Sequence, residues 1–158
     1  MIRAFRADDR LIHGQVQTMW ISEYGVNRVM IIDDSVASDP LQIHILKLAK
    51  PTGIDLVICG EDRAMELIGK DALQPNAKTF VIFKTIETAL RMQELGLEIP
   101  KIVIGPCSAK PGATQIGKNT YFTQSEIDAT NKLLQSGTEI LLQLLPNDTR
   151  VLWGDIKL

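Results

Sequence analysis

Residues 2–16 of the chain read IRAFRADDRLIHGQV, a strand, a charged loop and the start of a helix in one short stretch. The first part, Ile2 to Ala7, is mostly apolar and predicts a short strand. Beyond the loop, large apolar residues return at the spacing of one helix face, which predicts a helix over 14–24 that Gly25 ends. His13 stands where the loop becomes the helix.

The stretch around His13 has the chemistry of an anion site. The first amides of a helix lack partners within the helix and, with the helix dipole, favour a nearby anion. Gly14 has no side chain to shield them, and Arg10 adds a planar cation that suits phosphate. Asp8 or Asp9 is expected to hold Arg10, or to hold one ring nitrogen of His13 and so select its tautomer. The other nitrogen would then be a nucleophile able to accept and release a phosphoryl group.

The same residues also allow a structural interpretation. A single loop histidine such as His13 is commonly solvated or part of a helix cap. Asp8, Asp9 and Arg10 can form an ordinary surface ion pair, which contributes little to stability. The residue types alone leave both interpretations open.

Residues 8–16, DDRLIHGQV, with Arg6 just before them, resemble the N-terminal signature of the IIB components of the mannose/fructose/sorbose family of sugar phosphotransferase systems. Residues 31–40 and 46–53 extend the resemblance, which covers essentially the whole chain. It implies that His13 is the phosphorylated residue of a phosphotransferase. The phosphoryl group would come from a phosphohistidine of the IIA component and pass to a sugar entering through the membrane IIC and IID components.

Phosphoryl transfer depends mainly on in-line positioning and on stabilisation of charge. We expect Arg10 and the backbone amides of residues 13–15 to stabilise the transferring group, with Arg6 in support. The Gln15 side chain either donates to a phosphate oxygen or faces solvent. Because fixed donors already meet the charge, we expect neither a metal ion nor a cofactor.

A second candidate segment is residues 105–114, GPCSAKPGAT, which follows an expected strand over 101–104. Ligands of open α/β sheets bind beyond the carboxyl ends of strands, and the family resemblance places a loop of this region near the active site. Ser108 and Lys110 are therefore expected to face the loop that carries His13. Alternatively, the segment only connects the strand to a small hairpin.

Alternating strands and helices predict the fold. Apolar runs occur at 29–32, 55–59, 79–84, 101–104 and 140–145, each separated from the next by a helical pattern. This order is typical of an open, mostly parallel sheet with helices on both faces, here as one α/β domain over residues 1–158. The weakly alternating segment 115–122 predicts an edge strand.

The helix that begins at Pro40, with Asp39 as its N-cap, is expected to bury one apolar stripe. That stripe comprises Leu41, Ile45, Leu48 and Ala49. Members of the family named above often carry basic residues where this chain has Gln42 and Ile43. The resemblance therefore implies that a positive group facing phosphate is missing here.

The composition excludes several classes of protein. The formal net charge is −2 and no basic tract predicts binding to nucleic acid. No apolar run approaches the ~20 residues of a membrane span, and the start of the chain lacks the apolar stretch of a signal peptide. The 2 cysteines form no metal-binding motif and fit a reducing compartment. We therefore expect a cytoplasmic protein, peripherally associated with the membrane permease complex.

Two other functions remain as alternatives to the phosphoryl carrier. The same α/β fold can serve as a non-catalytic regulatory or ligand-binding module, against which the intact motif around His13 argues. A nucleotide-binding enzyme is disfavoured because the chain has no GxGxxG or GxxxxGK[ST] motif. The sugar and the oligomeric state stay open, with a homodimer among the alternatives.

Overall fold

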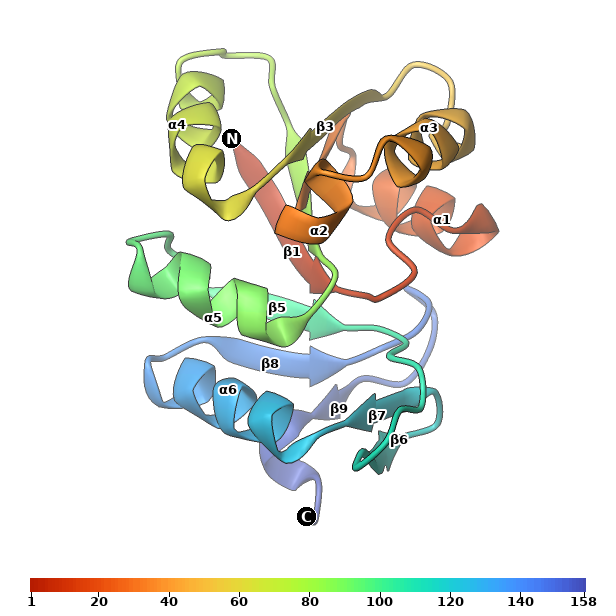
Figure 1. Cartoon of the computed structure of the whole chain (residues 1–158), viewed down its shortest axis with the longest axis vertical. Coiled ribbons are helices and arrows are strands. Elements are labelled where there is room, and N and C mark those ends of the chain that lie inside the picture. Colours follow the sequence, from red (N-terminus) through yellow and green to blue (C-terminus); the bar gives the residue numbers. More distant parts are fainter.

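Seven strands form one sheet in the order β3-β2-β4-β1-β5-β8-β9 in the computed structural model of the chain (Figure 1). They are β1 (Ile2–Ala7), β2 (Arg28–Ile32), β3 (Asp55–Cys59), β4 (Thr79–Phe83), β5 (Lys101–Ile104), β8 (Glu139–Leu142) and β9 (Val151–Leu152). All neighbours are parallel except β9, which pairs antiparallel with β8. The expected open, mostly parallel sheet is confirmed. The structure describes the chain path of all residues and the side chains of 1–14 and 17–158.

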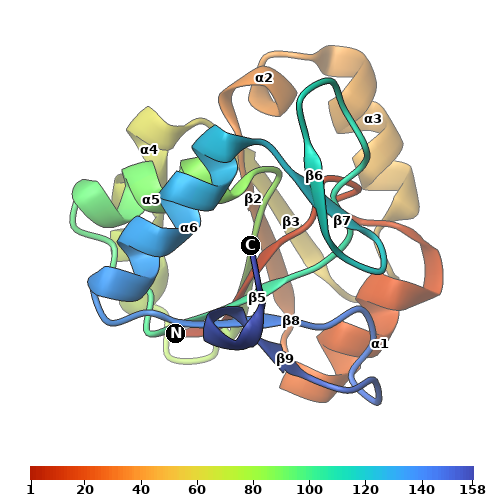
Figure 2. The same cartoon turned by 90° about the horizontal axis from the view of Figure 1, so that it is seen from below.

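The helices cover both faces of the sheet (Figures 1 and 2). They are α1 (Gly14–Tyr24), α2 (Asp34–Ala37), α3 (Pro40–Ala49), α4 (Glu61–Ala72), α5 (Ile86–Glu94) and α6 (Gln124–Gln135), followed near the end of the chain by a short 3-10 turn, Trp153–Asp155. One core lies under α4, α5 and α6 and includes Met92 and Leu133. The other lies under α1 and α3 and includes Trp20 and Leu46. No helix in the described part of the chain is long and apolar enough to cross a membrane.

Helix α3 turns a different face toward the sheet from the one that the sequence predicts. Asp39 caps the helix as expected, because its side chain accepts the N–H of Leu41 at 3.0 Å. However, Leu41 is 67% exposed, Ile45 53% and Leu48 74%, and Ala49 is exposed as well. Leu46 is the residue that is buried.

The reason for this difference lies in the sequence of α3 itself. Apolar residues occupy two faces, so periodicity cannot choose between a stripe through Leu41 and Ile45 and a narrower one through Ile43 and Leu46. In the structure the narrower face meets the core through Leu46.

The segment after β5 also differs from its expected form. Residues 115–122 do not make an edge strand of the main sheet; β6 (Thr114–Gly117) and β7 (Thr120–Phe122) pair with each other as an antiparallel hairpin. The edge beyond β8 is occupied by β9. The loop after β5 therefore leads into a small hairpin.

The two leucines of α3 provide a test of its rotation. Leu46→Ala should lower the free energy of unfolding by about 2–5 kcal/mol, because it leaves a cavity in the core. Leu48→Ala should change it by less than about 0.5 kcal/mol, because that side chain is already in water. Urea denaturation followed by circular dichroism measures both values. Equal losses in the two variants would show that α3 is rotated differently.

Candidate functional site

The site lies where two neighbouring strands send the chain in opposite directions. From β1 the chain runs through α1 to β2 on one side, and from β5 it runs through the hairpin and α6 to β8 on the other. The loops after such strands diverge and leave a crevice, which is where open α/β sheets bind ligands. Here the two loops are residues 8–13 and residues 105–113.

Asp9 ties these two loops together. Its backbone N–H donates to the carbonyl of Pro106 at 3.2 Å, and its Oδ2 accepts the N–H of Ser108 at 2.6 Å. Its Oδ1 is buried with no partner among the described residues. The segment after β5 thus contacts the loop after β1 at Ser108, through the backbone of that residue.

Local contacts fix the shape of the loop that carries His13. Asp8 Oδ1 accepts the N–H of Arg10 at 3.1 Å, and the Asp8 carbonyl accepts the N–H of Leu11 at 3.1 Å. Leu11 has a φ of 57°, a left-handed conformation that costs a bulky residue about 1–3 kcal/mol. The side chains of Leu11 and Ile12 are buried in the core under α1 and α3, which offsets that cost.

His13 follows these two anchors and is exposed. It is the N-cap residue of α1 with an extended backbone, and its side chain makes no capping hydrogen bond. Gly14 has a φ of +51°, which explains why glycine follows the histidine. The imidazole therefore lies exposed at the positive end of α1, with no hydrogen-bond partner among the side chains that the structure describes.

Arg6 lies beneath this loop and is wholly buried. Its Nε donates to Asp8 Oδ2 at 3.2 Å, and its two terminal nitrogens donate to the carbonyls of Gln143 and Leu144 at 3.0 and 3.1 Å. The guanidinium also packs over the Trp20 ring, 4.9 Å from the ring centroid. Arg6 thus joins β1, α1 and the loop after β8.

Asp8 is the buried partner of Arg6 and is 1% exposed. It also accepts a hydrogen bond from Gln17 Nε2 at 3.1 Å. Burial raises the pKa of the Asp8 carboxyl, and the charge of Arg6 opposes this effect. Burial lowers the pKa of the Arg6 guanidinium. Removing either member would leave an uncompensated charge inside the protein, which costs about 3–5 kcal/mol.

Two of the site residues predicted from the motif, Arg6 and Asp8, therefore make other contacts than those expected. Arg6 is expected to support the phosphate directly, but it has no exposed surface and its donors already have internal partners. Asp8 is expected to hold the Arg10 guanidinium or the His13 ring, but it accepts the backbone N–H of Arg10 and the side chain of Arg6. Both residues position the loop from below.

Gly105 is a residue of the site that the sequence does not single out. A Cβ at this position would lie 2.7 Å from Asp8 Oδ2 and would collide with the Arg6 guanidinium. Only glycine lets the end of β5 pass this close to the buried ion pair. The sole signal in the sequence is a glycine directly after a strand.

The remaining candidate residues differ in their exposure and in their ion pairing. Arg10 is exposed, and its guanidinium forms no ion pair with any side chain that the structure describes. Lys110 pairs with Glu126 Oε1 at 2.7 Å, so its charge is already matched. Ser108 is exposed. The Gln15 side chain lies outside the described residues.

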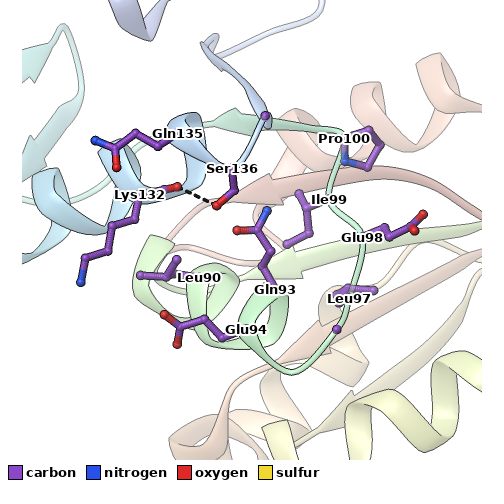
Figure 3. Close-up of a pocket in the computed structure, with 12 residues that line it drawn as sticks. Leu90, Gln93, Glu94, Leu97, Glu98, Ile99, Pro100, Lys132, Gln135 and Ser136 are labelled. Carbon is purple, nitrogen blue, oxygen red and sulfur yellow. Dashed lines mark hydrogen bonds between the residues drawn. The ribbon is translucent and has the colours of Figure 1, made fainter.

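A surface cavity of about 790 Å³ lies elsewhere in the molecule (Figure 3). Its wall includes Gly96 and Gly137, which follow α5 and α6, and Pro100, which precedes β5. It therefore opens at the amino ends of β5 and β8. Because β1 runs parallel to β5, the loop of His13 is at the opposite edge of the sheet.

Residues 2–157 match the protein family described as the PTS system sorbose subfamily IIB component. The chain belongs to this family. As a IIB component it is part of a sugar phosphotransferase system, in which IIB works with IIA and the membrane components, and its role is that of a transferase. The resemblance that residues 8–16 carry is thereby confirmed.

Relatives and solved structures extend along almost the whole IIB component. The sorbose-specific EIIB component of Lacticaseibacillus casei is 31% identical over 94% of this chain and 90% of its own length. The IIBSor domain of the Klebsiella pneumoniae sorbose permease, a crystal structure, superposes with a TM-score of 0.90 at 28% identity, covering 96% of this chain and 92% of the other. The mannose-specific EIIAB component of Escherichia coli is 26% identical over 96% of this chain, which spans 46% of that protein.

Two glycine variants test the packing beneath the loop that follows β1. Gly105→Ala should lower the free energy of unfolding by about 1–3 kcal/mol, because its methyl group collides with the buried ion pair. Gly69→Ala, inside α4 with no atom within 4 Å of the new Cβ, should raise it by about 0.5–1 kcal/mol through helix propensity. Thermal and urea unfolding measure both. A Gly105→Ala protein as stable as the wild type would contradict the close approach.

Proposed function

We propose that this IIB component carries a phosphoryl group on His13, which it receives from a phosphohistidine of the IIA component and passes to a sugar entering through IIC and IID. The observation that supports this most is the exposed imidazole at the positive end of α1, at the end of the loop that follows β1. In this proposal the protein works in the cytoplasm, docked in turn on IIA and on the membrane components.

The chemistry needs a nucleophile and fixed positive charge. One ring nitrogen of His13 attacks the phosphorus, so a new N–P bond forms while the N–P bond to the donor histidine breaks. The charge on the transferring group is stabilised by the Arg10 guanidinium and by the unpaired amides that begin α1. Asp9 keeps the two loops in register. A sugar hydroxyl then attacks the phosphorus, so an O–P bond forms while the N–P bond to His13 breaks, and the hydroxyl proton passes to the released imidazole.

The cysteines are poor alternatives as phosphoryl acceptors. Cys107 stands in the loop after β5, but it is 3% exposed and burial raises the pKa of its thiol to about 12. Burial likewise raises the pKa of Cys59 to about 11. Because the thiolate is the nucleophile, neither residue offers a reactive group at neutral pH. This supports histidine as the acceptor.

A transfer assay tests the assignment. With phosphorylated IIA protein of the same transport system, His13→Ala should take up no phosphoryl group, because the nucleophile is gone. Arg10→Ala should still be labelled, but about 100-fold more slowly, because one stabilising donor is lost. Radiolabel transfer followed in time measures both, and unchanged thermal melting excludes unfolding.

The second histidine provides the matched control. His44 is also exposed, and His44→Gln should be labelled to the same stoichiometry as the wild type. Acid-labile label on the His13→Ala protein would refute the proposal. Absence of label from the His44→Gln protein would refute it as well.

A further inference from the structure

Gln17 is a buried polar residue of α1 that the proposed mechanism does not use. Its side chain is 1% exposed, although glutamine usually lies at protein surfaces. Its Nε2 donates to Asp8 Oδ2 at 3.1 Å, whereas its Oε1 is buried with no hydrogen-bond partner among the described residues. Because an ionised carboxylate only accepts hydrogen bonds, the amide nitrogen must face Asp8, and the amide oxygen is the atom left unpaired.

The two polar atoms of this amide have opposite effects on stability. A hydrogen bond to a charged group is favourable, and a buried acceptor without a partner has a cost of comparable size. Gln17 therefore contributes little in total to the free energy of unfolding. An apolar side chain of the same length would fill the same space, and Arg6 would still donate to Asp8 Oδ2. Stability alone does not account for a glutamine at this position.

The contact with Asp8 joins the two groups that are proposed to stabilise the phosphoryl group. Asp8 Oδ1 accepts the backbone N–H of Arg10, and Asp8 Oδ2 accepts Gln17 Nε2 from α1. Among the side-chain hydrogen bonds that the structure describes, this is the one that joins α1 to the loop of residues 8–13. One carboxylate thus connects the backbone at Arg10 to the helix that bears the unpaired amides.

We propose that Gln17 is a positioning residue for phosphoryl transfer, which acts through Asp8 to hold the first amides of α1 at a fixed distance from Arg10. Because phosphoryl transfer depends on in-line geometry and on prearranged donors, a small shift of α1 lowers the rate without unfolding the domain. The inference rests on the proposed function. It adds to the site a residue that never touches the phosphoryl group.

The variant Gln17→Met separates alignment from stability, because methionine keeps the length of the side chain and removes both polar atoms. Its melting temperature should stay within about 4 °C of the wild type, since the two lost effects oppose each other. The kcat for transfer from phosphorylated IIA protein of the same system should fall about tenfold. The KM should stay within about twofold, because Gln17 has almost no surface to offer a partner. Gln17→Leu should behave in the same way.

Gln93 is the matched control. Its Nε2 also donates one hydrogen bond, to Thr138 Oγ1 at 3.0 Å, but it lies near the end of α5, at the edge of the sheet opposite the loop of His13. Gln93→Met should therefore leave both kcat and KM unchanged. Radiolabel transfer followed in time and thermal melting measure all the variants.

Inorganic phosphate gives a readout that needs no partner protein. In a titration followed by NMR, the amide signals at the start of α1 should report binding of phosphate that is several-fold weaker in Gln17→Met than in the wild type. Gln93→Met should bind phosphate as the wild type does.

Several results would overturn the inference. An unchanged kcat in both apolar variants would show that Gln17 does not align the site. A much larger fall in melting temperature, or failure of both variants to fold, would assign Gln17 to the stability of the domain. A raised KM with unchanged kcat would assign it to docking. If the wild type takes no label at His13, the proposed function fails. The phosphate titration then decides the inference: weaker binding by Gln17→Met supports it, and equal affinity, or no binding by the wild type, rejects it.

Discussion

The buried ion pair between Arg6 and Asp8 is the interaction on which the site depends. Such a pair adds little stability over a well-packed apolar substitute, so its importance here is positional. The Arg6 guanidinium reaches the carbonyls of Gln143 and Leu144 and the ring of Trp20, while Asp8 shapes the first turn of the next loop. One charge pair thus holds the end of β1, the loop after β8 and helix α1 in a single arrangement, and the exposed histidine rests on it.

The meeting of the two loops above this pair follows from the order of the strands. Because β1 and β5 are neighbours and send the chain in opposite directions, their loops can only meet at the carboxyl edge. Gly105 permits the approach and Asp9 locks it through Ser108. The strand order therefore brings the two loops to the same edge of the sheet, and a small number of polar contacts hold them together.

Features encoded within a few residues are predictable from the sequence. The bounds of α1, the capping position of His13 and the glycine after it all depend on local signals, and the structure shows each of them. The burial of Arg6 is not predictable in this way, because its two carbonyl acceptors are 137 and 138 residues away. The predicted rotation of α3 is wrong for a related reason. The helix has two apolar faces in its sequence, and tertiary packing decides which of them is buried. Likewise, no residue close to Lys110 in the sequence predicts its ion pair with Glu126.

Leu11 has a consequence for how the proposed phosphoryl carrier would meet its partners. Its left-handed backbone is unfavourable by itself and persists only because its side chain is part of the core. The loop is therefore preorganised: its shape is set when the domain folds rather than when another protein arrives. A donor and an acceptor of unrelated shape would then find the same rigid geometry, and neither would have to spend binding free energy on reorganising it.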